Sequence, residues 1–156
     1  MDTIRTPVQI FILMAALLHL ALGIGGFIGP IVEGAGAGGE GELFGFFAVN
    51  GALNVFNLAG GAVLLFAAMS ILGSIWASRL YAVVFAVLAV WGIAEVGLAG
   101  ADNALLADLL HINVVNNWAY IALTALYAIF GLVPSLWEPV THRGDRPMAG
   151  RGHAYR

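Results

Sequence analysis

Two sets of polar residues recur in this chain with the same spacing. The first set is Asn50, Asn54, Asn57 and Gly61, and the second, 63 positions later, is Asn113, Asn117, Tyr120 and Thr124. Steps of 4, 3 and 4 residues place the members of each set on one face of an α-helix. Amide side chains on an apolar helix either hydrogen-bond a neighbouring helix or hold a polar ligand. The spacing therefore predicts two inward-facing polar surfaces, which either pack together as an interhelical seam or line a cavity.

Two ionisable residues lie within hydrophobic stretches of the chain. Glu95 is the only acid inside a predicted membrane span, where an acid is by default a candidate for function, although it could also reach water or bond the amides. His19 lies near the middle of the first stretch, where an imidazole could hold a haem or a chlorophyll magnesium. His111 lies roughly 15 Å away in depth, too far for a bis-histidine haem. A neutral His19 bonded to a neighbouring helix is the favoured interpretation, so we expect no cofactor.

Other site chemistry has no support in the sequence. The chain has no cysteine, which excludes disulfides and thiol ligands. It contains no Ser-His-Asp order, no paired carboxylates and no Glu-x-x-His spacing on a predicted helix. We therefore expect no catalytic residue, no metal site and no enzyme. The net charge of −3 gives no basic surface for nucleic acid.

The composition is that of a membrane protein. Of the 156 residues, 61% are hydrophobic and only 10% are charged, whereas soluble domains carry roughly 25% charged residues. Apolar segments run over about 8–31, 44–69, 80–98 and 114–137, each close to the ~20 residues that cross a bilayer. The sequence predicts an all-α protein, a four-transmembrane-helix bundle in one domain over 1–137, followed by a basic tail over 138–156.

The basic residues predict the orientation of the spans. All are arginines, at positions 5, 79, 143, 146, 151 and 156. A four-span bundle places all six on one side, and the acidic links on the other. The positive-inside rule then puts both termini in the cytoplasm of a bacterial cell, with the protein multi-pass in the plasma (inner) membrane. A cleaved signal peptide is the alternative for 8–31, but this apolar run is longer than a signal peptide requires.

The links between the spans are short or rich in glycine. The link over 33–42 is acidic and Gly-rich, and we expect a flexible loop there. The link over 70–79 is short and carries Arg79, and part of the third link, over 104–110, is expected to form a short interfacial helix.

The two halves form a repeat that resembles a known family. Spans one and two form one hairpin and spans three and four another, which predicts a parallel repeat. Val49-Asn50-Gly-Ala-Leu53-Asn54-Val-Phe-Asn57 and Asn113-Val-Val-Asn116-Asn117-Trp118-Ala-Tyr120 resemble the two half-motifs of the bacterial four-span family catalogued as domain of unknown function 4383. The family's histidines are replaced here by Leu53, Asn57 and Tyr120, and its acidic residue by Asn116. The resemblance implies a fold and a membrane location, without an assigned activity.

Three functions remain for such a chain. The first is a non-enzymatic structural or accessory subunit that packs as a homo-oligomer or in a larger membrane complex. The second is a small-molecule or lipid binding or transport module that uses the outer asparagines and Glu95. The third, an enzyme acting on a lipid or quinone, has the least support because the sequence offers no nucleophile or redox group.

Overall fold

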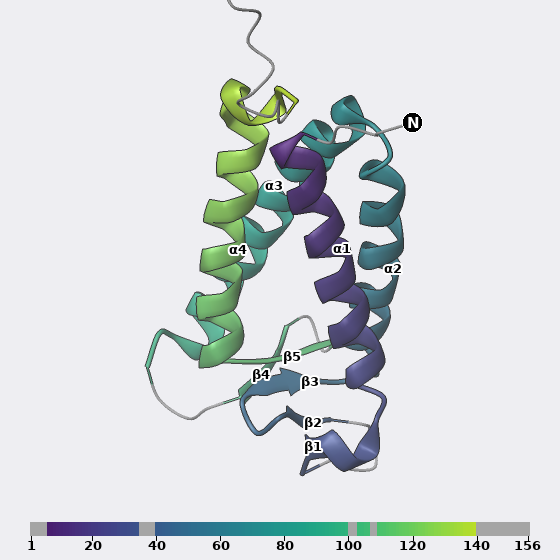
Figure 1. Cartoon of the computed structure of the whole chain (residues 1–156). Helices are drawn as coiled ribbons and strands as arrows, with labels where there is room; N and C mark the ends of the chain where they lie inside the picture. Colours follow the sequence, from purple (N-terminus) through teal and green to yellow (C-terminus); the bar gives the residue numbers. More distant parts are fainter. Residues whose placement is uncertain (1–5, 35–39, 100–102, 107–108, 140–156) are drawn as a thin grey trace, which may run out of the picture.

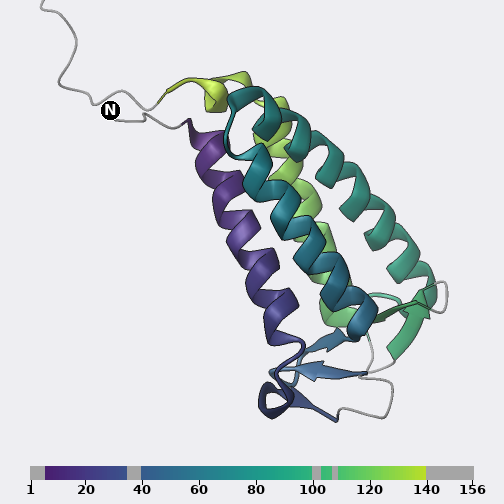
Figure 2. The ribbon, with the colours of Figure 1, turned by 90° about the vertical axis from the view of Figure 1, so that its right-hand side faces the viewer.

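A computed structural model describes residues 6–34, 40–99, 103–106 and 109–139. It is mostly helical: four helices lie side by side along one direction, and short strands gather at one end of them (Figures 1 and 2). The helices are α1 (Pro7–Gly25), α2 (Gly51–Ala67), α3 (Ile71–Val96) and α4 (Val114–Leu132). Three of them, α1, α3 and α4, are long and apolar enough to cross a membrane, and α2 is a shorter apolar helix. The prediction of a mostly helical chain is thus confirmed, and its three long apolar helices suggest a membrane protein.

The strands form two small antiparallel sheets. Strands β1 (Val32–Glu33), β2 (Gly41–Leu43) and β3 (Phe47–Val49) pair in that order, and β4 (Asn103–Leu106) pairs with β5 (Leu110–Asn113). In the first sheet Val32 lies opposite Leu43, and Gly41 lies opposite Val49. We call these strands, with the 3₁₀ turn η1 (Gly29–Ile31) and the described residues that join them to one another and to α1, the outer cap, because they lie beyond the ends of the helices. A second 3₁₀ turn, η2 (Pro134–Trp137), follows α4 at the opposite end.

The outer cap shortens the helices relative to the sequence prediction. The segment 8–31 is helical only to Gly25, and in the segment 44–69 the helix begins at Gly51, after β3. The expectation of a helix within 104–110 is wrong where the structure describes it, because β4 and β5 pair there. Part of the loop expected over 33–42 is also strand; its residues 35–39 lie outside the described residues. Backbone groups in these links bond one another across strands instead of along a helix.

The link expected over 70–79 is instead the first part of α3. Ser70 is the N-cap, and its hydroxyl accepts a hydrogen bond from the Gly73 amide at 3.0 Å, so the helix begins at once. Arg79 therefore lies in α3, roughly 12 Å along the helix at 1.5 Å per residue. Its Nε donates to the carbonyl oxygen of Gly131 in α4 at 2.9 Å, and its guanidinium lies 5.1 Å from the ring centre of Trp76. The arginine thus ties α3 to α4.

Helices pack most closely within each half of the chain. α1 packs mainly on α2, and α3 mainly on α4, so the polar surfaces of α2 and α4 do not form the direct helix–helix seam that the spacing suggested. Between the halves lies an aromatic core in which Tyr127 contacts Phe11, Tyr81 and Phe85 at centroid distances of 5.1–5.7 Å. Such edge and offset contacts are favourable beyond their burial.

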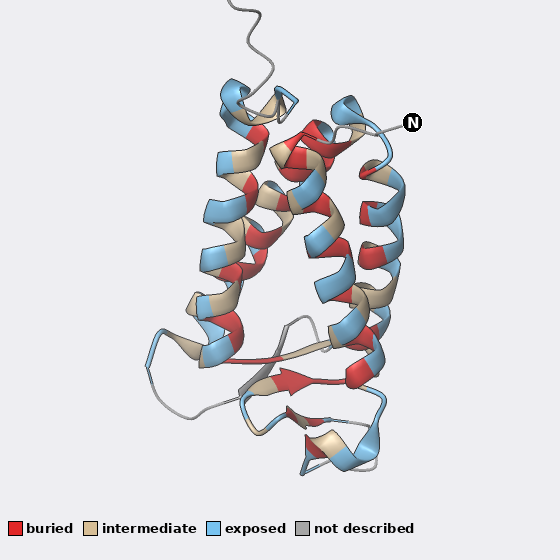
Figure 3. Ribbon diagram, viewed as in Figure 1, coloured by how far each residue is buried: buried red, intermediate tan, exposed pale blue. Residues whose placement is uncertain are grey.

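Burial follows the bundle interior, and the outward faces are apolar. Figure 3 shows the buried residues on the sides of the helices that face one another. Large apolar side chains such as Met14, Phe66 and Val90 are exposed on the outside, at 65%, 80% and 71%. In water such a surface would be unfavourable, whereas in a bilayer it faces lipid. The apolar outward faces and the three long apolar helices together suggest a membrane protein.

We expect the Gly61→Ala variant to be less stable by about 1–3 kcal/mol, the usual cost of overpacking. A Cβ at Gly61 would lie 2.7 Å from Cγ of Leu20 and 3.0 Å from the carbonyl oxygen of Ala16, so α1 and α2 would have to separate. Thermal unfolding of the purified protein in detergent measures the loss. Gly51→Ala is the control in the same helix, because nothing lies within 4 Å of its added Cβ. Equal effects of the two substitutions would contradict close packing of α1 on α2.

Candidate functional site

Asn50 and Asn113 are helix N-caps. Each has extended backbone immediately before α2 or α4, so neither belongs to the helical face that the spacing predicted. The Oδ1 atom of Asn50 accepts from the Leu53 amide at 2.9 Å, and that of Asn113 from the Asn116 amide at 3.0 Å. Asparagine is among the preferred N-caps because its side chain satisfies amides that the helix leaves unbonded. The repeat therefore marks two helix starts.

The same two side chains connect the halves of the chain by equivalent bonds. Nδ2 of Asn50 donates to the carbonyl oxygen of Leu109 at 2.7 Å, and Nδ2 of Asn113 donates to that of Phe46 at 2.7 Å. Leu109 lies four residues before Asn113, and Phe46 lies four residues before Asn50. Each asparagine thus holds the segment that leads into the other. We call these two bonds the reciprocal clamp.

Asn116 strengthens the same junction. Its Oδ1 accepts from the Ala48 amide at 3.0 Å, and its Nδ2 donates to the Ala48 carbonyl oxygen at 3.1 Å. The side chain thereby pairs with both polar groups of a β3 residue, as a neighbouring strand would. The sequence prediction did not include Asn116 among the site residues; its place one turn before Tyr120, on the same helix face, was the available signal.

Asn54 and Asn117 are packed against glycines. They are 1% and 0% exposed, and a Cβ at Gly26 would overlap the amide of Asn54, as one at Gly92 would overlap that of Asn117. Nδ2 of Asn117 donates to the carbonyl oxygen of Gly97 at 2.8 Å. The Oδ1 atoms of both asparagines are buried without a hydrogen-bond partner. These amides fill the close contact within each hairpin, and they do not line a cavity.

Two other predicted residues lie apart from this group. Oγ1 of Thr124 donates to the carbonyl oxygen of Tyr120 in its own helix at 2.7 Å. Glu95 is exposed on α3, where it accepts a hydrogen bond from Nε1 of Trp91 at 3.3 Å. The structure therefore does not bring Glu95 to the asparagines.

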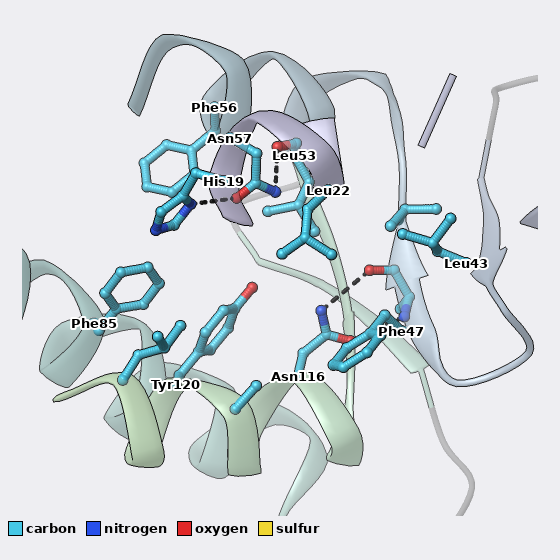
Figure 4. A pocket seen from close by; sticks show the side chains of 14 residues that line it. His19, Leu22, Leu43, Phe47, Leu53, Phe56, Asn57, Phe85, Asn116 and Tyr120 are labelled. Atoms are coloured by element: carbon cyan, nitrogen blue, oxygen red, sulfur yellow. Dashed lines mark hydrogen bonds between the residues drawn. The ribbon is translucent and has the colours of Figure 1, made fainter. Parts of the chain in front are cut away.

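A cavity of about 60 Å³ lies between the two halves, beneath the outer cap. Its walls come from all four helices and from β2 and β3 (Figure 4). The lining residues are His19, Leu22, Leu43, Phe47, Ala48, Val49, Leu53, Phe56, Asn57, Phe85, Asn116, Ala119, Tyr120 and Leu123. Three predicted site residues, His19, Asn57 and Tyr120, meet here. We call this space the His19 cavity.

Asn57 fixes the imidazole of His19. Nδ2 of Asn57 donates to the carbonyl oxygen of Leu53 at 3.1 Å, which leaves its Oδ1 to face Nδ1 of His19 at 2.8 Å. Because an amide oxygen only accepts, Nδ1 must carry the proton. In the neutral imidazole Nε2 is then an acceptor, and this atom is buried without a partner. The predicted bond from His19 to a neighbouring helix is thus present.

Tyr120 offers a second polar atom to the cavity. Its side chain is 6% exposed, and its hydroxyl is buried without a partner. Figure 4 shows this hydroxyl directed into the space between α4, α1 and α2. Among the residues that the structure describes, no three His, Asp or Glu side chains are grouped as metal ligands would be. The chemistry on offer in the cavity is hydrogen bonding by a fixed acceptor and a free hydroxyl.

Comparison with known proteins defines the family. The family model described as domain of unknown function (DUF4383) matches residues 9–133, from α1 to the end of α4. The chain belongs to this family. No curated protein and no solved structure matches it. Asn57 and Tyr120, which stand where the DUF4383 half-motifs have histidine, both line the His19 cavity.

We expect Asn50→Ala and Asn113→Ala each to destabilise the protein by about 2–4 kcal/mol. Each loses a helix cap, at about 1 kcal/mol, and leaves a carbonyl oxygen unpaired, at about 1–3 kcal/mol. Ser70→Ala is the matched control, because Ser70 caps α3 with one bond at an exposed position; it should lose only the cap contribution. Thermal unfolding in detergent compares the three variants. If the asparagine variants lost no more than Ser70→Ala, the reciprocal clamp would not contribute to stability.

Proposed function

We propose that this member of the DUF4383 family crosses the bacterial inner membrane four times and serves as a non-enzymatic accessory subunit of a larger membrane assembly. The apolar helices and the family match support a membrane location. The observation that carries the accessory role is a set of exposed aromatic side chains on the outer cap. The partner is a second copy of this chain or another membrane protein.

The course of the chain supports four crossings. α1 and α3 both run towards the outer cap, and α2 and α4 both run away from it. If α1 and α3 cross the bilayer in the same direction, α2 must cross back between them. At 1.5 Å per residue, the 17 residues of α2 span about 26 Å, close to the ~30 Å hydrocarbon core. At its C-terminal end, the carbonyl oxygens of Ala67 and Ala68 accept hydrogen bonds from Ser74 of α3 and Gln9 of α1.

The distribution of charge supports cytoplasmic termini. Glu33 and Glu42 lie in the outer cap, whereas Arg79 lies towards the opposite end of the bundle and contacts Gly131 near the end of α4. The remaining arginines adjoin that end in the sequence, before α1 and after η2. Loops that carry arginine are retained in the cytoplasm.

The outer cap presents aromatic groups beyond the ends of the helices. Phe27, Phe44 and Phe46 are each more than half exposed, at 56%, 53% and 57%. Glu33 and Glu40 are exposed on the same cap. Carboxylates are repelled by anionic lipid headgroups, so this combination suits a protein partner better than the membrane surface. Exposed phenylalanines of this kind are the residues on which protein interfaces are centred.

The orientation predicts the labelling of single cysteines, which the natural chain lacks. In intact cells, a membrane-impermeant maleimide should label Glu33→Cys, in the outer cap, and should label Glu138→Cys, after η2, only once the membrane is permeabilised. Both residues are exposed. Labelling of Glu138→Cys in intact cells would contradict cytoplasmic termini, and labelling of both would contradict an even number of crossings.

The accessory role predicts a native mass above that of one 16.3 kDa chain. Mild-detergent extracts should contain the protein in a larger species, and Phe44→Ser with Phe46→Ser should shift most of it to the mass of a single chain. Phe66→Ser, at a phenylalanine that is 80% exposed at the end of α2 away from the outer cap, is the control and should leave the large species intact. A strictly monomeric natural chain, or equal loss in the control, would overturn the proposal.

A further inference from the structure

We propose that the His19 cavity binds the hydroxyl-bearing head of a small, uncharged molecule from the membrane, of the phenol or alcohol class. The O–H of this molecule would donate to Nε2 of His19, and the hydroxyl of Tyr120 would bond its oxygen. This site is independent of the accessory role proposed above, and it differs from the outer asparagines and Glu95 that the sequence suggested for a ligand.

His19 carries its proton on a fixed atom. The bond to Asn57 at 2.8 Å holds the proton on Nδ1, and the bond from Asn57 to Leu53 keeps the amide from reversing. His19 is 2% exposed, and its Nε2 has no partner. A buried acceptor without a partner costs about 1–3 kcal/mol, so a molecule that donates a hydrogen bond here is stabilised by relieving that cost. The oxygen of a carbonyl or carboxylate has no proton to donate, so it would face the lone pair of Nε2 without forming a hydrogen bond.

The hydroxyl of Tyr120 is the other unpartnered polar atom of the cavity. It is buried and unpartnered, and it points into the same space from α4 (Figure 4). A phenolic O–H both donates and accepts. An alcohol or phenol bound to Nε2 would still have an oxygen lone pair free, which the Tyr120 hydroxyl can meet. The cavity walls thus carry both an acceptor and a donor that a hydroxyl-bearing molecule can use.

The size and the lining of the cavity limit the kind of molecule that it can hold. About 60 Å³ corresponds to roughly two water molecules at ~30 Å³ each, which suits a head of a few heavy atoms. Most of the walls are apolar, with the rings of Phe47, Phe56 and Phe85 among them. No charged side chain is found among the described lining residues, so an ionic head would be left unpaired. The cavity is only partly enclosed, which allows an apolar remainder to extend outwards.

Ordered water is the competing occupant. A polar cavity of this size can hold water if each molecule finds two to four polar partners. Here the mainly apolar walls limit such partners to His19, Tyr120 and their neighbours. The test must therefore separate a bound hydroxyl compound from water alone.

The experiment uses the full chain, purified in detergent and labelled with ¹⁵N histidine, with phenol and toluene as probes. The two compounds have nearly the same shape, but only phenol donates a hydrogen bond. We expect phenol to bind saturably, to raise the melting temperature and to shift the ¹⁵N resonance of His19 Nε2. Toluene should bind at least about fivefold more weakly, the typical effect of one hydrogen bond. Equal binding of the two, or no saturable binding of phenol, would leave water as the occupant and overturn the proposal.

Two matched variants test whether Tyr120 takes part in binding phenol. Tyr120→Phe removes the hydroxyl that faces the cavity and should weaken phenol binding about fivefold while the protein stays folded. Tyr127→Phe is the control, because Tyr127 also has a buried, unpartnered hydroxyl but does not line the cavity. Phenol affinity should be unchanged in this control. Equal weakening in both variants, or unchanged affinity in Tyr120→Phe, would contradict the assignment of Tyr120 to the site.

Discussion

Two hydrogen bonds between the halves of the chain hold the strands of the outer cap on the bundle. Asn50 and Asn113 each cap a helix and bond a carbonyl oxygen of the opposite half. The constraint behind them is general: near a membrane, backbone groups that leave a helix must find partners within the protein. The cap meets this requirement by strand pairing and by three asparagines, two of which also mark where α2 and α4 begin.

Hydrophobic content and periodicity were sufficient to predict a helical membrane protein, and the half-motifs around Asn50 and Asn113 were sufficient to identify the family. The helix limits were not predictable in the same way. Phe47–Val49 and Asn50 continue an apolar run in the sequence, so hydropathy does not distinguish the strand from the helix that follows it. The hydrogen bonds that fix where the strands end and the helices begin join residues some sixty positions apart. A hairpin signal was nevertheless present, in the apolar residues on either side of Phe44 and Gly45.

The polar residues of the repeat divide into two groups with different surroundings. The spacing placed them on one surface, but Asn54 and Asn117 are held tightly against glycine backbone, whereas Asn57 and Tyr120 face open space with His19. Their difference depends on what lies opposite: a glycine of the same hairpin for Asn54 and Asn117, or the His19 cavity for Asn57 and Tyr120. His19 acquires its defined hydrogen-bonding state from Asn57, so a residue that looked isolated in the sequence is one part of a pair. Such pairings arise from packing, which a single sequence does not specify.

The reciprocal clamp also bears on the order in which the protein is made. During synthesis α1 and α2 are made first, and at that stage Asn50 has no Leu109 to bond and β3 lacks the amide of Asn116. The outer end of the first hairpin is then an incomplete structure, with strand backbone that the second hairpin must cover. Each half therefore supplies hydrogen-bond partners that the other lacks, and neither half alone contains all the partners that the outer cap requires.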